Sequence, residues 1–378
     1  MKVYLDNGAT TKMDDAVLKA MQPYFTEKYG NASSLHSKGQ EAKMALEESR
    51  EIIAKKLNAR PDEIIFTSGG TESDNLAIKG IAYSKGKGHI ITSKIEHPAV
   101  LKTCEELQKQ NFEITYLNVD SEGFVSLQDL ENSIKENTIL ISIIHANNEI
   151  GTIQDIQKIG DICKKHNIPF HTDAVQSFCK EDINVKKTNI DLISISSHKI
   201  HGPKGIGALY VKKGNKLKKL IDGGKHEYNL RAGTENVSGA VGFAKAVKIS
   251  NNKDTKHMEN LRDYFIKEIL KIEKVKLNGP KDKRLCNNIN LAFAYIEGEA
   301  IGAYLDAKGI CSSTGSACSS KELKTSHVLQ AINLSPEYLN GSLRLTISKF
   351  TTKQEIDYVL QELPKIVHKL RKISPLGD

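Results

Sequence analysis

Short apolar, β-branched runs alternate with segments of helical periodicity through the first two thirds of this 378-residue chain. Segments such as residues 72–83 and 153–165 repeat apolar side chains at helical spacing. Strands that alternate with helices predict an α/β domain with a mostly parallel, doubly wound sheet. The seven runs expected to form its strands are residues 63–67, 89–92, 112–117, 139–144, 168–171, 191–195 and 207–211.

The pattern changes after about residue 250. A long helix is expected over residues 256–272, and strands are expected over residues 288–293 and 343–347. Thr352 and Glu355 have the spacing of a capping box at the start of a last helix. Behind them runs one apolar stripe of Ile356, Val359, Leu360, Leu363, Val367 and Leu370.

These two patterns predict two domains. Residues 13–250 would form a large α/β domain, and the rest would form a smaller C-terminal α+β domain. The first twelve residues could join either domain by this reasoning. We assign residues 1–12 and 251–378 to the small domain.

The composition is typical of a folded protein with large cores. Hydrophobic residues make up 39% of the chain and charged residues 26%, so disorder is not indicated. No run of 18 apolar residues occurs, and the N-terminus lacks the apolar stretch of a secretory signal. We therefore expect a cytoplasmic protein that does not enter a membrane.

The six cysteines form no C-x-x-C pair, and the histidines lack metal-finger spacing. Free thiols in a reducing compartment are expected, with no metal site. Cys311 and Cys318 could bridge or share a metal, but two further ligands are not evident nearby.

The formal net charge is +8, and lysines cluster in residues 212–219 and 365–372. We interpret both clusters as solvated surface. Aromatic residues do not interleave with these charges, so direct nucleic-acid binding is not expected. A docking face for an acidic protein partner stays open.

Five of the seven runs end in chemically active residues, each time at the carboxyl end. These ends read SGGTES at residues 68–73, EH at 96–97, HANNE at 145–149, TDAVQ at 172–176 and SSHK at 196–199. The carboxyl ends of parallel strands lie at one edge of a sheet, where ligands bind. Five such clusters in phase predict a single site at that edge.

The turn at residues 68–71 precedes a helical segment, and its glycines would let backbone N–H groups approach an anion. This predicts a phosphate seat, although an ordinary helix cap would have the same residues. Neither a P-loop nor a G-x-G-x-x-G fingerprint is present. Asp173 ends an apolar strand, where a carboxylate needs a partner such as a protonated ring nitrogen. A structural ion pair or helix cap is the alternative.

His97 could act as a base, lie flat on an aromatic ligand, or only be hydrogen-bonded in place. Lys199 ends a strand expected to be buried, and burial would lower the pKa of its amine and make it a nucleophile toward carbonyls. Lys204 is the rival lysine, in a Pro/Gly turn that indicates exposure. A phosphate seat, a carboxylate for a ring nitrogen, an imidazole and a reactive lysine together indicate pyridoxal 5′-phosphate (PLP).

With these motifs the chain resembles, across essentially its whole length, the group I cysteine desulfurases of the NifS/IscS type. They are class V aminotransferase-like, fold-type I PLP enzymes. The matching motifs are LDNGATT at residues 5–11, TSGGTESDN at 67–75, EH at 96–97, NNEIG at 147–151, DAVQ at 173–176, SHKIHGPKG at 197–205, RAGTEN at 231–236 and STGSAC at 313–318.

The resemblance implies a homodimer in which Lys199 is joined covalently to PLP, His97 stacks on its ring and Asp173 pairs with its ring nitrogen. Gln176 would lie near the phenolic oxygen of the ring. Residues implied to hold the phosphate are Gly70, Thr71, Ser196 and His198, with Thr234 reaching in from the second subunit. Asn148 would contact the cofactor and, with Arg344, would bind the carboxylate of L-cysteine.

The resemblance also gives a reason for a thiol in the small, polar run CSSTGSACSS at residues 311–320. Cys318, on a loop of about residues 311–325, would accept sulfur from L-cysteine as a persulfide and leave L-alanine. Lys199 would remove the α-proton and His97 would handle the thiol proton. The sulfur would pass to an iron–sulfur scaffold protein or another acceptor, for cluster assembly, tRNA thiolation or both. Cys311 is expected to be structural.

Small departures from the family pattern are Gly8, Lys12 and Ala232. None removes a functional group, although Gly8 could alter the substrate pocket. An aminotransferase or a selenocysteine lyase would use the same scaffold. A non-catalytic scaffold would be expected to lack Lys199 or Asp173, and metal-dependent hydrolysis finds no ligand spacing.

Overall fold

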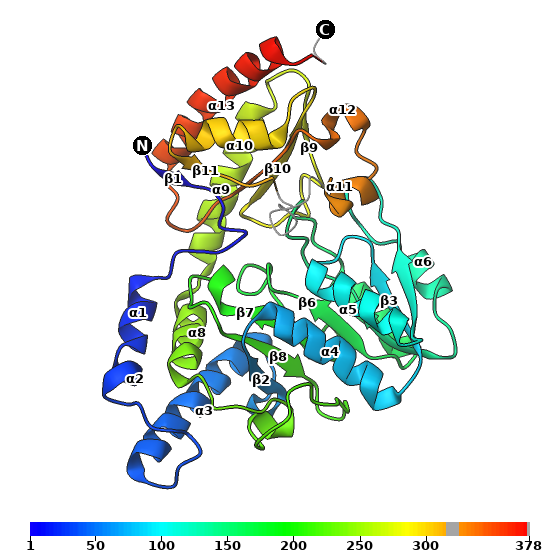
Figure 1. Ribbon diagram of the computed structural model, residues 1–378, viewed down its shortest axis with the longest axis vertical. Coiled ribbons are helices and arrows are strands. Elements are labelled where there is room, and N and C mark those ends of the chain that lie inside the picture. The colour runs from blue at the N-terminus through cyan, green and yellow to red at the C-terminus, as the bar shows by residue number, and fades with distance from the viewer. Residues whose placement is uncertain (315–324, 376–378) are drawn as a thin grey trace.

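The computed structural model describes residues 1–314 and 325–375. It has a large lower lobe built on one sheet and a smaller upper lobe that carries both termini (Figure 1). The large sheet has the strand order β2-β8-β7-β6-β5-β3-β4, and only β8 runs against its neighbours. Its strands are β2 (Ile64–Thr67), β3 (His89–Ser93), β4 (Glu113–Leu117), β5 (Thr138–Ser142), β6 (Phe170–Asp173), β7 (Leu192–Ser196) and β8 (Gly207–Val211).

Helices cover both faces of this sheet, because successive apolar residues along each strand point to opposite faces. One face, with Ile65, Ile90, Leu140, Leu192 and Leu209, packs against α4 (Gly70–Lys85) and α5 (Pro98–Lys109). The other face, with Phe66, Ile91, Ile141 and Ile193, packs against α3 (Ser37–Leu57), α7 (Ile156–Lys165) and α8 (Val237–Ile249). The predicted doubly wound architecture is confirmed, and all seven predicted strands are present.

The smaller lobe has its own core around an antiparallel sheet in the order β12-β10-β9. These strands are β12 (Ser342–Thr346), β10 (Asn288–Phe293) and β9 (Val275–Leu277). The helices packed against them are α9 (Asn252–Ile269), α10 (Gly298–Asp306) and α13 (Lys353–Ile373). Thr352 and Glu355 form the predicted capping box of α13, and every residue of its predicted stripe is buried or partly buried in this core.

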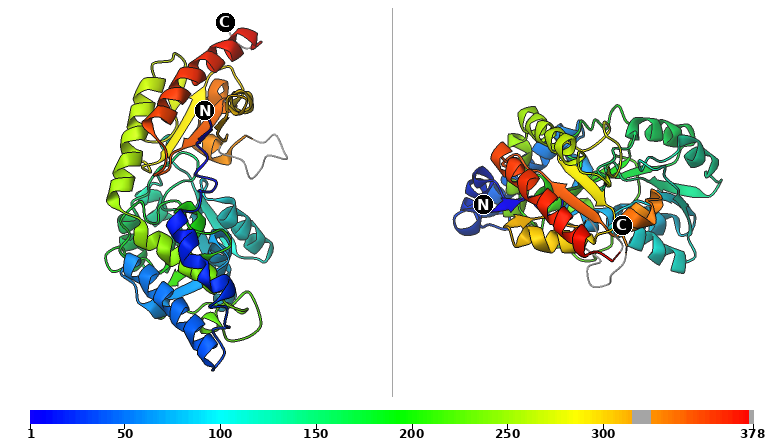
Figure 2. Two further views of the ribbon diagram at one scale, coloured as in Figure 1. Left: turned by 90° about the vertical axis from the view of Figure 1, so that its left-hand side faces the viewer. Right: turned by 90° about the horizontal axis from the view of Figure 1, so that it is seen from above.

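The N-terminal segment belongs to the small lobe before it descends to the large one (Figure 2). Strand β1 (Val3–Tyr4) pairs in parallel with β11 (Ile310–Cys311), and Val3 and Leu5 are buried in the small-lobe core. The chain then leads to α1 (Asp15–Met21) and α2 (Pro23–Thr26) beside the large lobe. This placement supports the assignment of residues 1–12 to the small domain, although the domain boundaries stay a prediction.

The two lobes are not separated cleanly in sequence. Helix α11 (His327–Ala331) follows the small-lobe elements in the chain, yet Val328 and Leu329 are buried in the core of the large lobe. The remaining helices are α6 (Leu127–Asn132) and α12 (Pro336–Leu339). Among the described residues, no helix has both the length and the apolarity needed to span a membrane.

Candidate active site

The predicted strand ends converge on one cavity of about 310 Å³ between the lobes. Ten of the predicted site residues line it, namely Gly70, Thr71, His97, Asn148, Asp173, Gln176, Ser196, His198, Lys199 and Arg344. Gly8, Ala9, Asp74, Ile144 and Val175 complete the lining. Six of the seven strands in the large sheet are mutually parallel, and five of them (β2, β3, β5, β6 and β7) lead at their carboxyl ends into segments that carry these residues.

Lys199 follows β7 in a short 3₁₀ turn, and its amine points into this cavity. Nζ donates to the backbone oxygens of Gly8 at 2.5 Å and Ala9 at 2.8 Å. Burial, together with the positive charge of Arg344, lowers the pKa of Lys199 to about 7. The negative charge of Asp173 raises this pKa, but by less than Arg344 lowers it. An amine with this pKa is half neutral at pH 7 and can attack a carbonyl carbon. Lys204 is exposed in its turn, as predicted.

Asp173 is the last residue of β6 and is 5% exposed. Its Oδ1 accepts a hydrogen bond from the Val175 amide at 2.9 Å. Burial raises the pKa of Asp173 to about 6, while the nearby Lys199 lowers it. The carboxylate is therefore largely ionised at pH 7 and suits a cationic partner in the cavity.

A second carboxyl group, Asp74 of α4, lines the same cavity and was not among the predicted site residues. Burial raises the pKa of Asp74 well above its usual range, and the charge of Asp173 raises it further. Its Oδ1 has no hydrogen-bond partner within the described part of the chain. Burial and the charge of Asp173 both disfavour a charge on Asp74, so we assign Asp74 as the neutral member of the pair and Asp173 as the charged one.

His97 caps the N-terminus of α5, where its Nδ1 accepts a hydrogen bond from the Ala99 amide at 3.1 Å. Burial lowers the pKa of His97 to about 4, and the charge of Lys199 adds to this effect. The ring is therefore neutral at pH 7. Because Nδ1 is the acceptor, the ring proton is on Nε2.

The N-terminus of α4 has the features of an anion seat. Its cap residue, Gly69, provides no side-chain cap, so the first backbone N–H groups of the helix are left to another acceptor. The hydroxyl of Ser196 is buried without a hydrogen-bond partner among the described residues. A Cβ at Gly70 would come within 2.6 Å of the Val175 side chain, so only glycine fits the helix start here.

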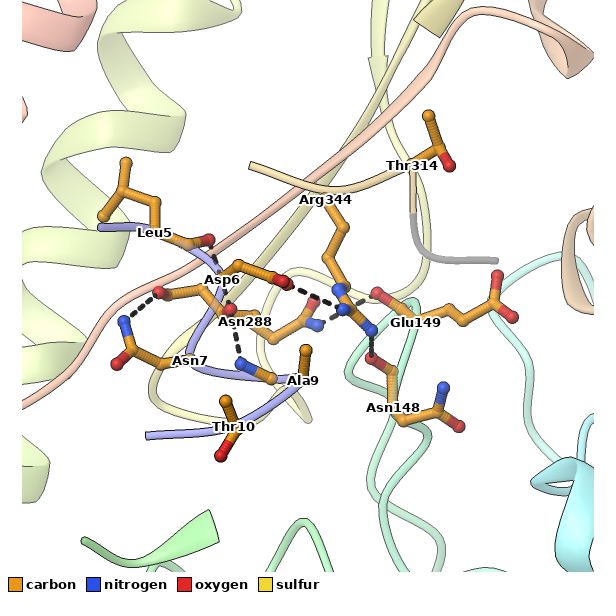
Figure 3. Close-up of polar contacts among 12 residues, drawn as sticks. Leu5, Asp6, Asn7, Ala9, Thr10, Asn148, Glu149, Asn288, Thr314 and Arg344 are labelled. Carbon is orange, nitrogen blue, oxygen red and sulfur yellow. Dashed lines mark hydrogen bonds and ion pairs between the residues drawn. The ribbon is translucent and has the colours of Figure 1, made fainter. Parts of the chain in front are cut away.

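Arg344, on β12 of the small lobe, is buried with two acceptors at its guanidinium group (Figure 3). Nη1 donates to the backbone oxygen of Asn148 at 3.0 Å, and Nη2 donates to Asp6 Oδ1 at 2.9 Å. Gln176 lies nearby and donates through Nε2 to the Gly8 oxygen at 2.9 Å. The sequence patterns include Asp6 only within the LDNGATT motif of residues 5–11, and they do not predict its contact with Arg344.

Of the predicted site residues in the described part of the chain, one does not line the cavity. Thr234 is exposed and lines no part of the cavity. Cys318 and most of the predicted loop lie outside the described residues. Cys311, expected to be structural, pairs through its backbone with Tyr4, but its side chain is exposed.

A family model described as aminotransferase class-V matches residues 3–359. The chain belongs to the class-V aminotransferase family. Within this family it is similar to curated cysteine desulfurases named IscS. The protein of Dictyoglomus turgidum is 54% identical over 99% of this chain and 96% of its own length. The protein of Methanosarcina thermophila is 52% identical over 99% of this chain and 94% of its own length.

Solved structures agree with this placement. A NifS-like protein superposes with a TM-score of 0.92 at 40% identity, covering 98% of this chain and all of that one. A structure described as SspA in complex with cysteine has a TM-score of 0.85 at 40% identity, covering 93% of this chain and 100% of the other. The predicted fold and the predicted kinship with cysteine desulfurases are confirmed.

Proposed function

We propose that this chain is a PLP-dependent sulfurtransferase of the cysteine desulfurase type, which converts L-cysteine to L-alanine and carries the sulfur on Cys318. One observation carries the proposal. A half-neutral amine at Lys199, an ionised Asp173 and the guanidinium of Arg344 line one cavity. The amine suits an aldehyde, the carboxylate suits a cationic ring, and the guanidinium suits a substrate carboxylate.

The residues present fit PLP. The uncapped start of α4 at Gly70 and Thr71, the unpartnered Ser196 hydroxyl and the His198 ring form the seat for its phosphate. Lys199 would bind its aldehyde carbon, Asp173 its ring nitrogen and Gln176 its phenolic oxygen. His97 would lie against the ring, with Asn148 at its edge. When bound, the cofactor supplies an electron sink that makes the carbon–sulfur bond of cysteine breakable.

The protein side chains would then divide the remaining work. Arg344 and Asn148 orient the substrate carboxylate, and the neutral amine of Lys199 takes the α-proton. His97, neutral with its proton on Nε2, exchanges the proton of the substrate thiol. The thiolate of Cys318 attacks the substrate sulfur, so that a sulfur–sulfur bond forms as the carbon–sulfur bond breaks. A proton added to the remaining carbon skeleton completes L-alanine.

A homodimer is part of the proposal, with Thr234 of each subunit reaching the phosphate in the other. Thr234 is exposed and outside its own cavity, which is what such an arrangement needs. Large apolar side chains are exposed near α2, α3 and the turn at Tyr228, namely Phe25, Tyr29, Leu35, Met44 and Tyr228 itself. Size-exclusion chromatography with light scattering tests this, and a monomer at micromolar concentration contradicts it.

The persulfide sulfur would pass to an acceptor protein, either an iron–sulfur scaffold or a tRNA-thiolation protein, in the cytoplasm. A persulfide is reactive toward another thiolate and needs no further cofactor for transfer. Neither nucleic acid nor a membrane is proposed as a direct partner.

The decisive experiment is to incubate the purified chain with PLP, L-cysteine and a reductant and to quantify alanine and sulfide. Equal amounts of the two are expected. Lys199→Ala should lose the visible absorption of bound PLP and all turnover. Cys318→Ser should keep the absorption but lose persulfide transfer, whereas an aminotransferase would be indifferent to it. Intact PLP absorption with no alanine from cysteine would contradict the proposed reaction.

A further inference from the structure

Arg344 already has a carboxylate partner from the chain itself. Asp6 Oδ1 lies 2.9 Å from Nη2 of Arg344, and Figure 3 shows the guanidinium between Asp6 on one side and Asn148 on the other. The side chain of Arg344 is 4% exposed and that of Asp6 is 21% exposed. A guanidinium has five N–H donors, and the two contacts described use two of them. The Nε donor is buried and has no partner within the described residues.

The backbone around Asp6 is fixed to the strand that carries Arg344. Asp6 forms a parallel bridge with Thr346, two residues along β12 from Arg344. Gly8 donates its amide to Thr346 Oγ1 at 2.6 Å, and Asn7 Nδ2 donates to the Thr346 oxygen at 2.7 Å. Ala9 closes the turn by donating to the Asp6 oxygen at 3.0 Å. These hydrogen bonds of the neighbouring residues therefore hold the Asp6 carboxylate beside the guanidinium of Arg344.

We propose that Asp6 is a positioning residue that acts as the resident counter-ion of Arg344, holding the guanidinium in place and weakening the grip of the site on carboxylates. This inference rests on the proposed function, in which Arg344 binds the substrate carboxylate. Asp6 has two separable effects. Its oxygen orients the guanidinium, which favours substrate binding. Its negative charge repels an incoming carboxylate, which opposes substrate binding and eases release of the amino-acid product.

Two substitutions separate these effects. Asp6→Asn keeps an oxygen acceptor for Nη2 but removes the charge, so KM for L-cysteine should fall by about three- to tenfold. Asp6→Ala removes the charge and the acceptor together, so the loss of orientation should offset that gain and leave KM above that of Asp6→Asn by about threefold or more. A residue with a merely structural role would raise KM in both variants or in neither.

Asp14→Asn is the matched control. Asp14 also lies in the N-terminal segment, and its Oδ2 is 2.6 Å from Nζ of Lys349 in the small lobe. Neither residue of this pair lines the cavity. The substitution removes the same charge from a similar contact between the N-terminal segment and the small lobe, and asparagine still caps α1. KM for cysteine should be unchanged.

A binding measurement separates this inference from the proposed function. Propionate, a carboxylate without amine or thiol, is titrated calorimetrically into the PLP-loaded full chain. Asp6→Asn should bind propionate more tightly than the wild type, and Asp6→Ala should bind it more weakly than Asp6→Asn. This holds even if cysteine turnover is absent, a result that would contradict the proposed function alone. Equal changes in both Asp6 variants, or none, overturn the counter-ion role. Should Asp6→Ala fail to fold, a propionate affinity of Asp6→Asn at or below wild type overturns it.

Discussion

The lowered pKa of Lys199 can be measured directly on the protein without PLP. Burial and the charge of Arg344 lower this pKa to about 7, whereas an unperturbed lysine titrates at about 10.4. At pH 7 about half of the Lys199 amine would be neutral, against roughly 1 in 2,500 for an ordinary lysine. Trace labelling with acetic anhydride, read by mass spectrometry of the labelled peptide, reports the neutral fraction. The Lys199 label should rise with a midpoint near pH 7.

Substitutions identify the cause of the shift. Arg344→Gln removes a positive charge that lowers the pKa of Lys199, so the labelling midpoint should move to higher pH. Lys212→Gln removes an exposed positive charge outside the cavity and should leave the midpoint in place. A Lys199 midpoint above pH 9 in the unsubstituted chain would refute the reasoning, because the amine would then be solvated. An unchanged midpoint in Arg344→Gln would refute the electrostatic part alone.

Three further perturbations follow from the same structure. Glu227→Gln removes the buried carboxylate that pairs with Arg50 and leaves that guanidinium only the more exposed Glu47 as a charge partner. It should lower the free energy of unfolding by about 3 kcal/mol, measured in urea, whereas the exposed Asp62→Asn should cost under about 1 kcal/mol. Gly70→Ala should weaken PLP binding about tenfold in absorption titrations, and the added substitution Val175→Ala should restore it by removing the methyl group that the new Cβ meets. Burial raises the pKa of Glu96 to about 8, so its contribution to stability is full below about pH 4 and is lost as the pH rises through 8. Glu96→Gln should therefore flatten the fall in urea midpoint between pH 5 and 8, and an unchanged slope would contradict this.

The strands of the large sheet were predictable because all of them except the edge strand β4 are largely buried on both faces. A central strand such as β7 is mostly apolar, with Leu192, Ile193 and Ile195 buried, and its polar residues lie toward the carboxyl end that reaches the site. The position of Lys199 and Asp173 at such ends was enough to predict their convergence. The antiparallel strand β8 has the same apolar character as its neighbours, so composition could not reveal its direction.

Contacts between distant parts of the chain were not predictable from local patterns. Arg344 and Asp6 are 338 residues apart, and Arg50 and Glu227 are 177 residues apart. No periodicity links such pairs. The only local signal for Asp6 is a charge that directly follows the fully buried Leu5. Asp74 gave a similar weak signal, because Ala77 and Ile78, one turn later on α4, are apolar and buried.

The charges of the cavity are matched to its proposed contents group by group. Asp74 is neutral because burial and the charge of Asp173 raise its pKa, and this leaves one carboxylate for one cationic ring nitrogen. Lys199 is half neutral at pH 7, so its amine is available for covalent chemistry and does not form a permanent ion pair. The carboxylate of Asp6 offsets the positive charge of Arg344 until a substrate carboxylate binds. Burying these groups would be costly if each carried an unpaired charge. The cavity reduces that cost by keeping one acid protonated, one amine about half uncharged and one guanidinium paired, which is the state that a cofactor and an amino-acid substrate would complete.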